Sequence, residues 1–230
     1  KIISPEKKHL NILNITQLQK YINNDLFCVI NFSGQIGQNT NDINILGNKN
    51  ILKIFKKKKI TSPLIFFSST LIKSSKKNKL EKIKNVGINS IYANSKIEAE
   101  NFLMKNYDKT IILRISNVYD NKFKKNSIFR NILNSIKNNS ILNISNIKTY
   151  RNYIHIDDLA GHINYLLKDP NKIKNSKIIS LVNENFNIRQ IIKLFEKKYN
   201  IKINIKDFKK NLKKNYSQKI YVKSFKTNLI

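Results

Sequence analysis

Short apolar runs of strand length alternate with segments of helical period along most of this 230-residue chain. Neighbouring parallel strands need a crossover connection, which a helix usually provides, so the alternation predicts an α/β fold built on a parallel sheet. The predicted strands are 9–13, 26–32, 63–70, 110–116, 141–145, 177–182 and 201–205. The predicted helices are 16–22, 42–58, 89–107, 127–138 and 188–199, the first of them capped by Thr16.

The basic charge has a simple compositional source. Of the 230 residues 40% are hydrophobic, enough for one large core or two small ones, and the formal net charge is +30. The charge is nearly all lysine, and the arginines are Arg114, Arg130, Arg151 and Arg189. Nucleic-acid surfaces use arginine heavily for bidentate contacts. Abundant Lys, Asn and Ile instead indicate the codon bias of an A/T-rich genome, so we expect solvated lysines and no nucleic-acid partner.

The single cysteine, Cys28, lies within an apolar run and is expected to be a small core residue in a reducing compartment. No stretch reaches the roughly 18 apolar residues of a membrane span, and no signal peptide is visible. A cytoplasmic location without a membrane partner is therefore the expectation.

Tyr92 and Lys96 are four residues apart in a predicted helix, so both side chains project from one face. A neighbouring ammonium favours the phenolate, and a pKa shift of ~3 units corresponds to about 4 kcal/mol. Such a shift makes Tyr92 a usable base near neutral pH. Thr70 ends a predicted parallel strand, at the edge where such sheets bind ligands, and its hydroxyl can bind the same substrate oxygen. A helical Tyr and Lys pair is otherwise ordinary surface, so the surrounding sequence decides its meaning.

Six sequence segments occur around this pair in a fixed order: VINFSGQIG (29–37), NILGNKNIL (44–52), FFSST (66–70), YANSKIEAE (92–100), LRISNVYD (113–120) and RNYIHIDDLA (151–160). Together they resemble the extended short-chain dehydrogenase/reductase family, the NAD-dependent epimerase/dehydratases, with a UDP-glucose 4-epimerase-like pattern. In that family, 29–37 is the fourth strand with its small-residue turn, 44–52 is the Asn-Val-x-Gly-Thr helix, and 66–70 is the strand of the catalytic Ser or Thr. Segment 92–100 is the catalytic helix, 113–120 is the Leu-Arg-x-x-Asn-Val-Tyr-Gly strand, and 151–160 is a stretch of the substrate domain.

The resemblance implies a Rossmann-like, doubly wound parallel sheet in residues 1–120, which bind NAD or NADP. Residues 121–230 form a smaller, partly interleaved substrate-binding domain, whose segment 150–169 packs back on the first part. The Lys-rich tail after Phe208 has no clear pattern.

The resemblance also assigns roles at the site. Tyr92 exchanges a proton with a sugar hydroxyl while hydride passes to or from the nicotinamide. Lys96 binds the nicotinamide ribose and lowers the Tyr92 pKa, and Thr70 holds the reacting oxygen. The other implied cofactor residues are Asn11, Ile12, Phe32, Ser33, Gly34 and Asn44. The implied substrate residues are Thr70, Asn117 and Arg151, the last on the diphosphate, which suits a guanidinium.

Two further patterns receive a structural interpretation. His155, Asp158 and His162 stand at i, i+3 and i+7, which can place three metal ligands on one helical face. Structural roles are favoured, because the family uses no metal and carries His at the position of His155. Gly34 and Gly37 follow what resembles the fourth strand and lack a third glycine, so they form no dinucleotide fingerprint.

The family begins with a strand and a Gly-x-x-Gly-x-x-Gly turn that binds the pyrophosphate. This chain begins at Lys1 and contains no such turn. We therefore expect an N-terminally truncated chain without the first two strands, which by itself binds NAD poorly and is inactive.

The residues after Thr70 bear on the reaction. They are Leu71 and Ile72, whereas the family's 4,6-dehydratases carry Asp-Glu there and GDP-fucose synthases carry Cys at the second position. Neither Leu nor Ile transfers protons. The remaining reactions are 4-epimerisation of a nucleotide sugar and net reduction of a 4-keto sugar. Asp120 replaces the glycine of the family's strand.

Two other classes of function stay open, namely a non-catalytic relative of the fold and, least favoured, an RNA-binding basic protein. The intact set of Thr70, Tyr92 and Lys96 argues against the first. The RNA-binding role rests on charge alone, and a steep salt dependence of binding to unrelated RNAs would mark it as nonspecific. The family implies a homodimer formed through the helices 42–58 and 89–107.

Overall fold

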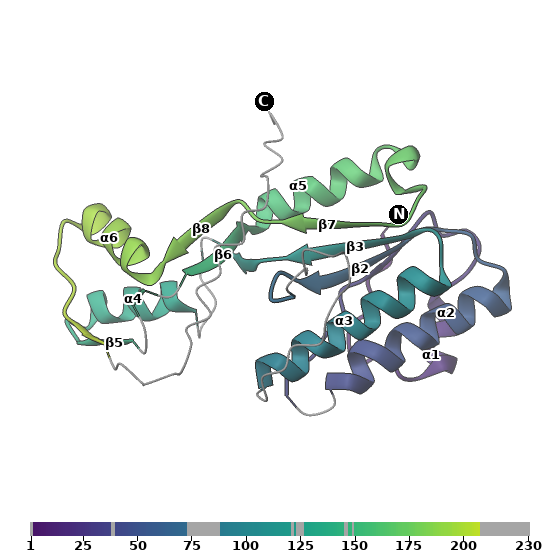
Figure 1. Cartoon of the computed structure of the whole chain (residues 1–230), viewed down its shortest axis with the longest axis horizontal. Helices are drawn as coiled ribbons and strands as arrows, with labels where there is room; N and C mark the ends of the chain where they lie inside the picture. Colours follow the sequence, from purple (N-terminus) through teal and green to yellow (C-terminus); the bar gives the residue numbers. More distant parts are fainter. Residues whose placement is uncertain are drawn as a thin grey trace. The chain divides into compact units, whose positions relative to one another are not determined.

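The computed structural model describes residues 2–37, 40–72, 88–120, 122, 127–144, 147–148 and 150–207, which Figure 1 traces along the chain. The chain divides into two compact units. The first unit contains Lys1–Ile115 and Ile163–Ser180, and the second contains Ser116–His162 and Leu181–Ile230. Across the described ranges, no helix is both long enough and apolar enough to span a membrane.

The first unit is built on a four-stranded sheet in the order β1 (Val29–Asn31), β2 (Leu64–Ser69), β3 (Thr110–Ile115) and β7 (Lys177–Leu181). Strand β2 runs parallel to both β1 and β3, with Leu64 beside Val29 on one side and beside Thr110 on the other. Consecutive residues of β2 and β3 are buried on both faces. This burial explains their continuously apolar sequence and confirms the predicted α/β fold with a parallel sheet.

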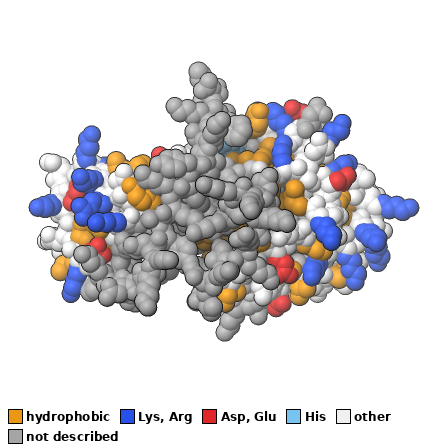
Figure 2. Space-filling model, viewed as in Figure 1, with side chains coloured by type: hydrophobic (Ala, Val, Ile, Leu, Met, Phe, Trp, Pro, Cys, Tyr) orange, Lys and Arg blue, Asp and Glu red, His pale blue; other side chains and the backbone are white. Residues whose placement is uncertain are grey.

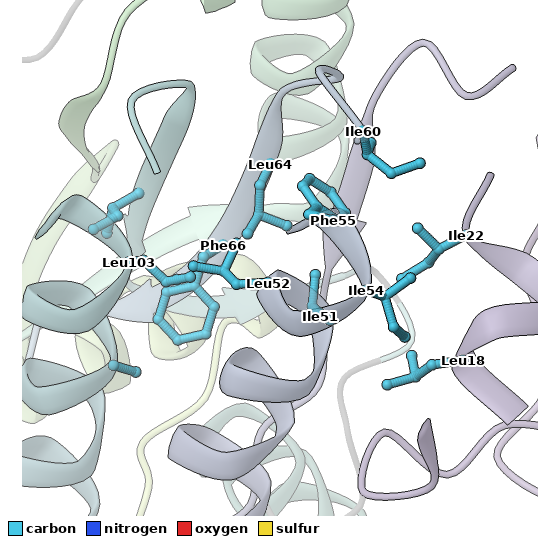
Figure 3. Packing of buried hydrophobic residues seen from close by; sticks show 12 residues of the cluster. Leu18, Ile22, Ile51, Leu52, Ile54, Phe55, Ile60, Leu64, Phe66 and Leu103 are labelled. Atoms are coloured by element: carbon cyan, nitrogen blue, oxygen red, sulfur yellow. The ribbon is translucent and has the colours of Figure 1, made fainter. Parts of the chain in front are cut away.

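Helices cover one face of this sheet: α1 (Ile15–Tyr21), α2 (Gly47–Lys58) and α3 (Ile88–Asn106), with a π-helical turn at Asp42–Leu46 leading into α2. Figure 3 shows how their apolar side chains meet those of β2. The cluster includes Leu18 and Ile22 near α1, Ile51, Leu52, Ile54 and Phe55 of α2, Leu103 of α3, and Leu64 and Phe66 of β2. The residues of α2 recur at helical spacing, which gives the helix one apolar face.

The start of the chain differs from the prediction. Residues 9–13 form turns, not a strand, and α1 is capped by Asn14 and not by Thr16. The side-chain oxygen of Asn11 accepts from the N–H of Leu13 at 3.0 Å, and that of Asn14 accepts from the N–H of Gln17 at 3.0 Å. Asparagine side chains of this kind satisfy nearby backbone groups and so compete with strand pairing.

The second unit contains a three-stranded sheet and a two-stranded sheet. The first has the order β4 (Asn117–Tyr119), β6 (Tyr150–His155), β8 (Glu184–Asn187), with β4 and β6 parallel and β6 and β8 antiparallel. The second pairs β5 (Leu142–Ile144) with β9 (Ile205–Asp207). Helices α4 (Ile128–Lys137) and α6 (Ile188–Tyr199) share a core with these strands through Ile132, Leu142, Ile144, Tyr153, Ile188, Ile191 and Ile192.

Helix α5 (Ile156–Leu167) and a 3-10 turn at Pro170–Ile173 connect β6 to β7. The predicted helices 127–138 and 188–199 are confirmed within one residue at each end. The short strand β8 was not predicted, and the strand expected at 201–205 lies at Ile205–Asp207. Residues 73–87, and the Lys-rich tail at 208–230, lie outside the described part. The predicted packing of 150–169 on the first part stays a prediction.

Charged side chains stay mostly at the surface. In Figure 2 the Lys and Arg side chains are spread among uncharged ones over the visible surfaces of both units. Among the described residues, the charged side chains that are buried are Lys96, Glu100 and Arg114. Lys96 and Glu100 lie on α3, the helix in which the sequence predicted the reactive pair, and Arg114 lies on the adjoining strand β3.

Candidate active site

Thr70 lies directly after β2, at the carboxyl end of a parallel strand. Its backbone N–H donates to the carbonyl of Ile115, at the same end of the neighbouring strand β3, over 3.0 Å. The residue is buried. The structure therefore places Thr70 at the edge of the sheet where α/β proteins bind their ligands.

Lys96 is the most unusual lysine of the described chain, because its side chain is only 2% exposed. Its Nζ donates to the carbonyl oxygen of Phe67 at 2.9 Å and to that of Ser33 at 3.5 Å. It also lies 4.5 Å from the centroid of the Phe66 ring, within the range of a cation–π contact. The ammonium group thus joins α3 to the carboxyl half of β2 and to the turn that follows β1.

Burial lowers the pKa of Lys96 to about 8, and the nearby Glu100 carboxylate opposes this shift. At neutral pH Lys96 therefore remains mostly an ammonium, but one that gives up its proton far more readily than an exposed lysine.

Tyr92 lies one helical turn before Lys96 and is half-buried. Burial raises its pKa, opposite to the direction expected from a neighbouring ammonium. The geometry gives the reason: Nζ of Lys96 bonds backbone carbonyls and lies 5.9 Å from the centroid of the Tyr92 ring. Desolvation of the phenolate thus outweighs the attraction of the ammonium in this structure.

The turn after β1 contains Phe32, Ser33 and Gly34, three of the predicted cofactor residues. Phe32 is 63% exposed although its ring packs 4.3 Å from that of Phe67, centroid to centroid. A Cβ atom on Gly34 would lie 3.0 Å from Nζ of Lys96 and 3.4 Å from Oδ1 of Asn44. The missing side chain of Gly34 therefore lets the turn lie directly against the buried ammonium.

Asn44, in the π-helical turn before α2, is completely buried. Its Oδ1 accepts from the N–H of Gln35 at 3.3 Å, and its Nδ2 donates to the carbonyl of Gln35 at 3.2 Å and to the hydroxyl of Ser95 at 2.8 Å. The Ser95 hydroxyl in turn donates to the carbonyl of Tyr92 at 2.7 Å. Asn44 thus ties the turn to the helix of Tyr92 and Lys96. Such π-helical turns occur frequently at functional sites.

Asn11 and Ile12 lie in the turns before α1 and not at the end of a strand. The side chain of Asn11 closes its own turn, and Ile12 lies against Gly47 at the start of α2, where an added Cβ would come within 2.9 Å of its Cγ2 atom. Their cofactor role stays a prediction.

Asn117 and Arg151 belong to the second unit. Asn117 begins β4 and its Nδ2 donates to the carbonyl of Asn152 on β6 at 3.0 Å. Arg151 is an exposed residue of β6. Asn117 pairs with Tyr153 in the ladder, and Arg151 is two residues before Tyr153, so both predicted substrate residues point to the same face of their sheet.

The three candidate metal ligands do not share one helical face, because His155 ends β6 and α5 begins at the next residue. The Nδ1 atom of His155 lies 3.4 Å from a carboxylate oxygen of Asp157. Within the described ranges, no group of three or more His, Cys, Asp or Glu side chains could hold a metal ion.

Two features of the site were not predicted. One is the ion pair of Glu100 with Arg114. The sequence does contain a sign of this pair, because Glu100 is one helical turn after Lys96 and Arg114 interrupts an apolar strand. The other is the set of hydrogen bonds that Asn31 and Asn48 form behind the turn. Asparagine is abundant in this chain, so nothing in the sequence distinguishes these two from surface asparagines.

The first unit thus places the hydroxyl of Thr70 directly after β2, and the phenol of Tyr92 and the ammonium of Lys96 on α3, with a glycine turn against that ammonium. Such a set can hold a substrate oxygen and exchange a proton with it.

Known proteins share this architecture. The structure of RMD from Pseudomonas aeruginosa in complex with NADPH superposes with a TM-score of 0.70 at 16% identity, over 89% of this chain and 75% of that chain. UDP-glucuronic acid 4-epimerase from Bacillus cereus, in complex with UDP-glucuronic acid and NAD, superposes with a TM-score of 0.68 at 19% identity, over 87% of this chain and 67% of that chain. dTDP-4-dehydrorhamnose reductase from Bacillus anthracis, in complex with NADP, superposes with a TM-score of 0.71 at 19% identity, over 91% of this chain and 76% of that chain.

No curated protein sequence matches the chain significantly. At these identities the solved structures establish the fold, which is Rossmann-like. The sequence profile of the NAD dependent epimerase/dehydratase family matches residues 4–188, which include the two segments that carry Thr70, Tyr92 and Lys96. Because this match covers most of the chain, the protein belongs to the NAD-dependent epimerase/dehydratase family.

Proposed function

We propose that this protein is a nucleotide-sugar oxidoreductase that acts at C4 of the sugar by hydride transfer to and from NAD or NADP, with Tyr92 as acid and base. The observation that carries the proposal is the position of Lys96. Its ammonium bonds the carbonyl of Phe67, three residues before Thr70, and lies one helical turn from Tyr92. The buried ammonium thereby links the strand that ends before Thr70 to the helix that carries Tyr92.

The residues around the turn fit the nicotinamide end of a dinucleotide. Gly34 leaves its backbone open where a Cβ would press on Lys96, and the exposed ring of Phe32 offers an apolar surface beside it. Lys96 can donate a hydrogen bond to a ribose hydroxyl next to the two carbonyls that it already contacts. The bound dinucleotide supplies the acceptor and donor of hydride.

Two side chains of the site handle the proton of the reacting sugar hydroxyl. Thr70 holds the sugar oxygen, and Tyr92 takes its proton when the sugar is oxidised and returns a proton when the ketone is reduced. The residues that follow, Leu71 and Ile72, carry no group that transfers protons, and Leu71 is exposed while Ile72 is buried. Redox chemistry at one carbon is therefore favoured over water elimination or epimerisation beside the ketone.

Net reduction of a 4-keto sugar is the second candidate, and one observation favours it. Burial raises the pKa of Tyr92 and so favours the protonated form of the phenol. A protonated phenol is the form that donates a proton to a ketone as hydride arrives. In the alternative 4-epimerisation, Tyr92 must first accept a proton.

The substrate side of the proposal rests on the second unit. Asn117 and Arg151 project from one face of its three-stranded sheet, and a guanidinium can bind a diphosphate by two parallel hydrogen bonds. Two of the similar structures bear the names of a UDP-sugar epimerase and a dTDP-sugar reductase. We propose a nucleotide diphosphate sugar as the substrate class.

We also propose a homodimer formed through α2 and α3. The exposed apolar side chains of Leu46, directly before α2, and Ile91 on α3 support this pairing.

The chain contains no Gly-x-x-Gly-x-x-Gly turn, and we propose that these 230 residues bind NAD weakly. Calorimetry measures the dissociation constant, and a micromolar value would contradict weak binding. Activity is therefore tested at dinucleotide concentrations above the measured constant, with UDP- and dTDP-hexoses and their 4-keto forms as substrates.

Two measurements separate the candidate reactions. Formation of the 4-epimer without net change in nicotinamide absorbance indicates epimerisation, and stoichiometric loss of reduced nicotinamide indicates reduction. In either case Tyr92→Phe is expected to lower kcat by about 10²- to 10⁴-fold, the range of general acid–base catalysis. Turnover that survives this substitution unchanged overturns the assigned role of Tyr92.

A further inference from the structure

A set of buried asparagine side chains lies behind the turn formed by Ser33, Gly34 and Gln35. Asn48 on α2 is completely buried, and Asn31 at the end of β1 is nearly so. Oδ1 of Asn48 accepts from Nδ2 of Asn31 at 2.9 Å, and Nδ2 of Asn48 donates to the backbone carbonyl of Asn44 at 2.7 Å. Both ends of the Asn48 amide are therefore used, one toward β1 and the other toward the π-helical turn.

The two neighbours of Asn48 hold the turn from opposite ends. Oδ1 of Asn31 accepts from the backbone N–H of Ser33 at 2.9 Å and also from the Ser33 hydroxyl. The side chain of Asn44 bonds both backbone groups of Gln35. Asn48 thus connects the residue that fixes the beginning of the turn with the residue that fixes its end.

The turn held in this way carries one of the carbonyls that Lys96 binds. The carbonyl oxygen of Ser33 lies 3.5 Å from Nζ of Lys96, and the next residue, Gly34, packs against the same Nζ. Through Ser95, Asn44 also bonds the backbone of Tyr92. A shift of the turn therefore changes the surroundings of the ammonium.

We propose that Asn48 is a positioning residue for Tyr92 and Lys96: by bridging Asn31 to Asn44 it fixes the carbonyl of Ser33 against the Lys96 ammonium. The Asn48 amide bonds its two asparagine neighbours and acts on the reactive side chains through the turn. The catalytic meaning of this position rests on the proposed function, whereas the geometric effect on Lys96 does not.

Threonine and valine at position 48 form a matched pair, because they have the same shape and differ in one hydroxyl. A threonine hydroxyl in a helix can donate to the carbonyl four residues earlier, here that of Asn44, and its oxygen can accept from Nδ2 of Asn31. Valine offers neither bond, so it leaves a buried donor on Asn31 without its acceptor.

Titration of the lysines by NMR, with ¹³C at Cε, measures the effect without substrate or dinucleotide. Exposed lysines titrate near pH 10.4, whereas Lys96 has a pKa of about 8, and its signal is identified by its absence in Lys96→Met. Other groups facing Lys96 remain in both variants: Glu100 and Tyr92 from α3, the Phe66 ring and the Phe67 carbonyl from β2, and Arg114 from β3, which pairs with Glu100.

Loss of a hydrogen bond to the charged form disfavours that form, so Asn48→Val is expected to lower the pKa of Lys96 further, by about half a pH unit. Asn48→Thr is expected to keep the value of the unchanged chain. If Asn48→Val gives no folded protein, Asn48→Ala removes the same amide without adding volume to the core and is expected to produce the same shift.

Tyr107→Phe is the structural control. Tyr107 lies just beyond the C-terminal end of α3, and its hydroxyl donates to the carbonyl of Ser62 at 2.6 Å. The variant therefore loses one partly buried bond in the same unit, and it is expected to leave the Lys96 titration unchanged. Equal pKa values of Lys96 in the Asn48→Thr and the valine or alanine variants overturn the proposal, as does an equal shift in Tyr107→Phe.

The proposed function fails separately, if the unchanged chain converts none of the sugars offered at saturating dinucleotide. In a chain that does turn over, Asn48→Val is expected to lower kcat several-fold with little change in KM, and to move the alkaline limb of the pH profile to lower pH. Asn48→Thr is expected to restore both. A valine variant with unchanged kcat and pH profile overturns the positioning role in catalysis.

Discussion

Arg114 on β3 and Glu100 on α3 form a buried ion pair in which both carboxylate oxygens are engaged. Nε of Arg114 lies 3.0 Å from Oε1 of Glu100, and Nη2 lies 2.6 Å from Oε2. The Glu100 side chain is not exposed at all, and that of Arg114 is 8% exposed. Because Glu100 also faces Lys96 from one turn away, the pair couples the strand to the helix of the candidate site.

Removal of Arg114 alone leaves a buried carboxylate without its partner. We expect Arg114→Met to lower the free energy of unfolding by about 3–5 kcal/mol, the usual cost of breaking a buried pair. Urea denaturation measures this change. The double variant Arg114→Met with Glu100→Leu removes both charges and is expected to recover much of the loss.

The surface pair of Lys8 and Glu6 is the matched comparison, since both side chains are more than two thirds exposed at an N–O distance of 3.0 Å. Glu6→Gln is expected to change stability by no more than about 1 kcal/mol. A loss in Arg114→Met no larger than that in Glu6→Gln would contradict the burial of the first pair.

Lys96 makes stability depend on pH in a direction opposite to that of a salt-bridged lysine. Burial lowers its pKa from 10.5 to about 8 in the folded chain. Between these values the unfolded chain binds a proton that the folded chain does not, so stability rises with pH across this window. The total gain is about 3 kcal/mol at 1.36 kcal/mol per pH unit.

Other groups titrate in the same range, so the measurement is a difference between two chains. Urea denaturation of the unchanged chain and of Lys96→Met is followed from pH 7 to 10.5. The unchanged chain is expected to gain stability relative to Lys96→Met as the pH rises above about 8. A difference that stays constant with pH would show that Lys96 is not desolvated in the folded state.

The parallel sheet could be predicted from the sequence because its central strands are apolar without interruption. The predicted segments 63–70 and 110–116 became β2 and β3 with small changes at their ends. The prediction failed where local polar side chains decide the backbone. Asn11 and Asn14 close turns in a segment whose apolar residues resemble a strand, and Asn14 replaces Thr16 as the cap of α1.

For the site, the sequence could identify the reactive groups but not their surroundings. The helical spacing of Tyr92 and Lys96 is a local property, and the structure reproduces it. The hydrogen-bond partners of the Lys96 ammonium depend on the tertiary structure, since they are carbonyls of β2 and of the turn after β1. For this reason the predicted direction of the Tyr92 pKa was wrong: the ammonium faces the backbone and burial dominates.

Gly34 and Gly37 offer a comparison between side-chain crowding and backbone strain. A Cβ at Gly34 would lie 3.0 Å from Nζ of Lys96, at the flexible end of that side chain, whereas one at Gly37 would meet nothing within 4 Å. Gly37 instead has a φ of 102°, which strains any other residue. Gly34→Ala is therefore expected to displace the ammonium and shift its titration, with a stability loss of about 1 kcal/mol, because the close atom is the flexible end of a side chain.

Gly37→Ala is expected to lower stability by about 1–2 kcal/mol and to leave the Lys96 titration unchanged. The same NMR titration and urea denaturation report both effects. An unchanged Lys96 signal in Gly34→Ala would show that the ammonium does not lie against the turn.

Gly47, the first residue of α2, is fixed by its contact with Ile12. A Cβ at Gly47 would lie 2.9 to 3.0 Å from three carbon atoms of the Ile12 side chain. In a helix alanine is favoured over glycine by about 1 kcal/mol, so crowding and helix propensity act in opposite directions. We expect crowding to prevail and Gly47→Ala to lower the free energy of unfolding by about 1–2 kcal/mol.

Truncation of Ile12 to alanine deletes all three of these carbon atoms and lets helix propensity show. Ile12→Ala alone is expected to cost about 2 kcal/mol, since it deletes a partly buried side chain beyond Cβ. In the double variant the Cβ added at position 47 occupies part of the space left by those atoms, so the two losses should not add. A double-mutant cycle in urea measures the coupling, which is expected to be favourable by about 1 kcal/mol. Additive losses would show that Ile12 does not lie on Gly47, and that the turns before α1 are not packed against α2 as the structure has them.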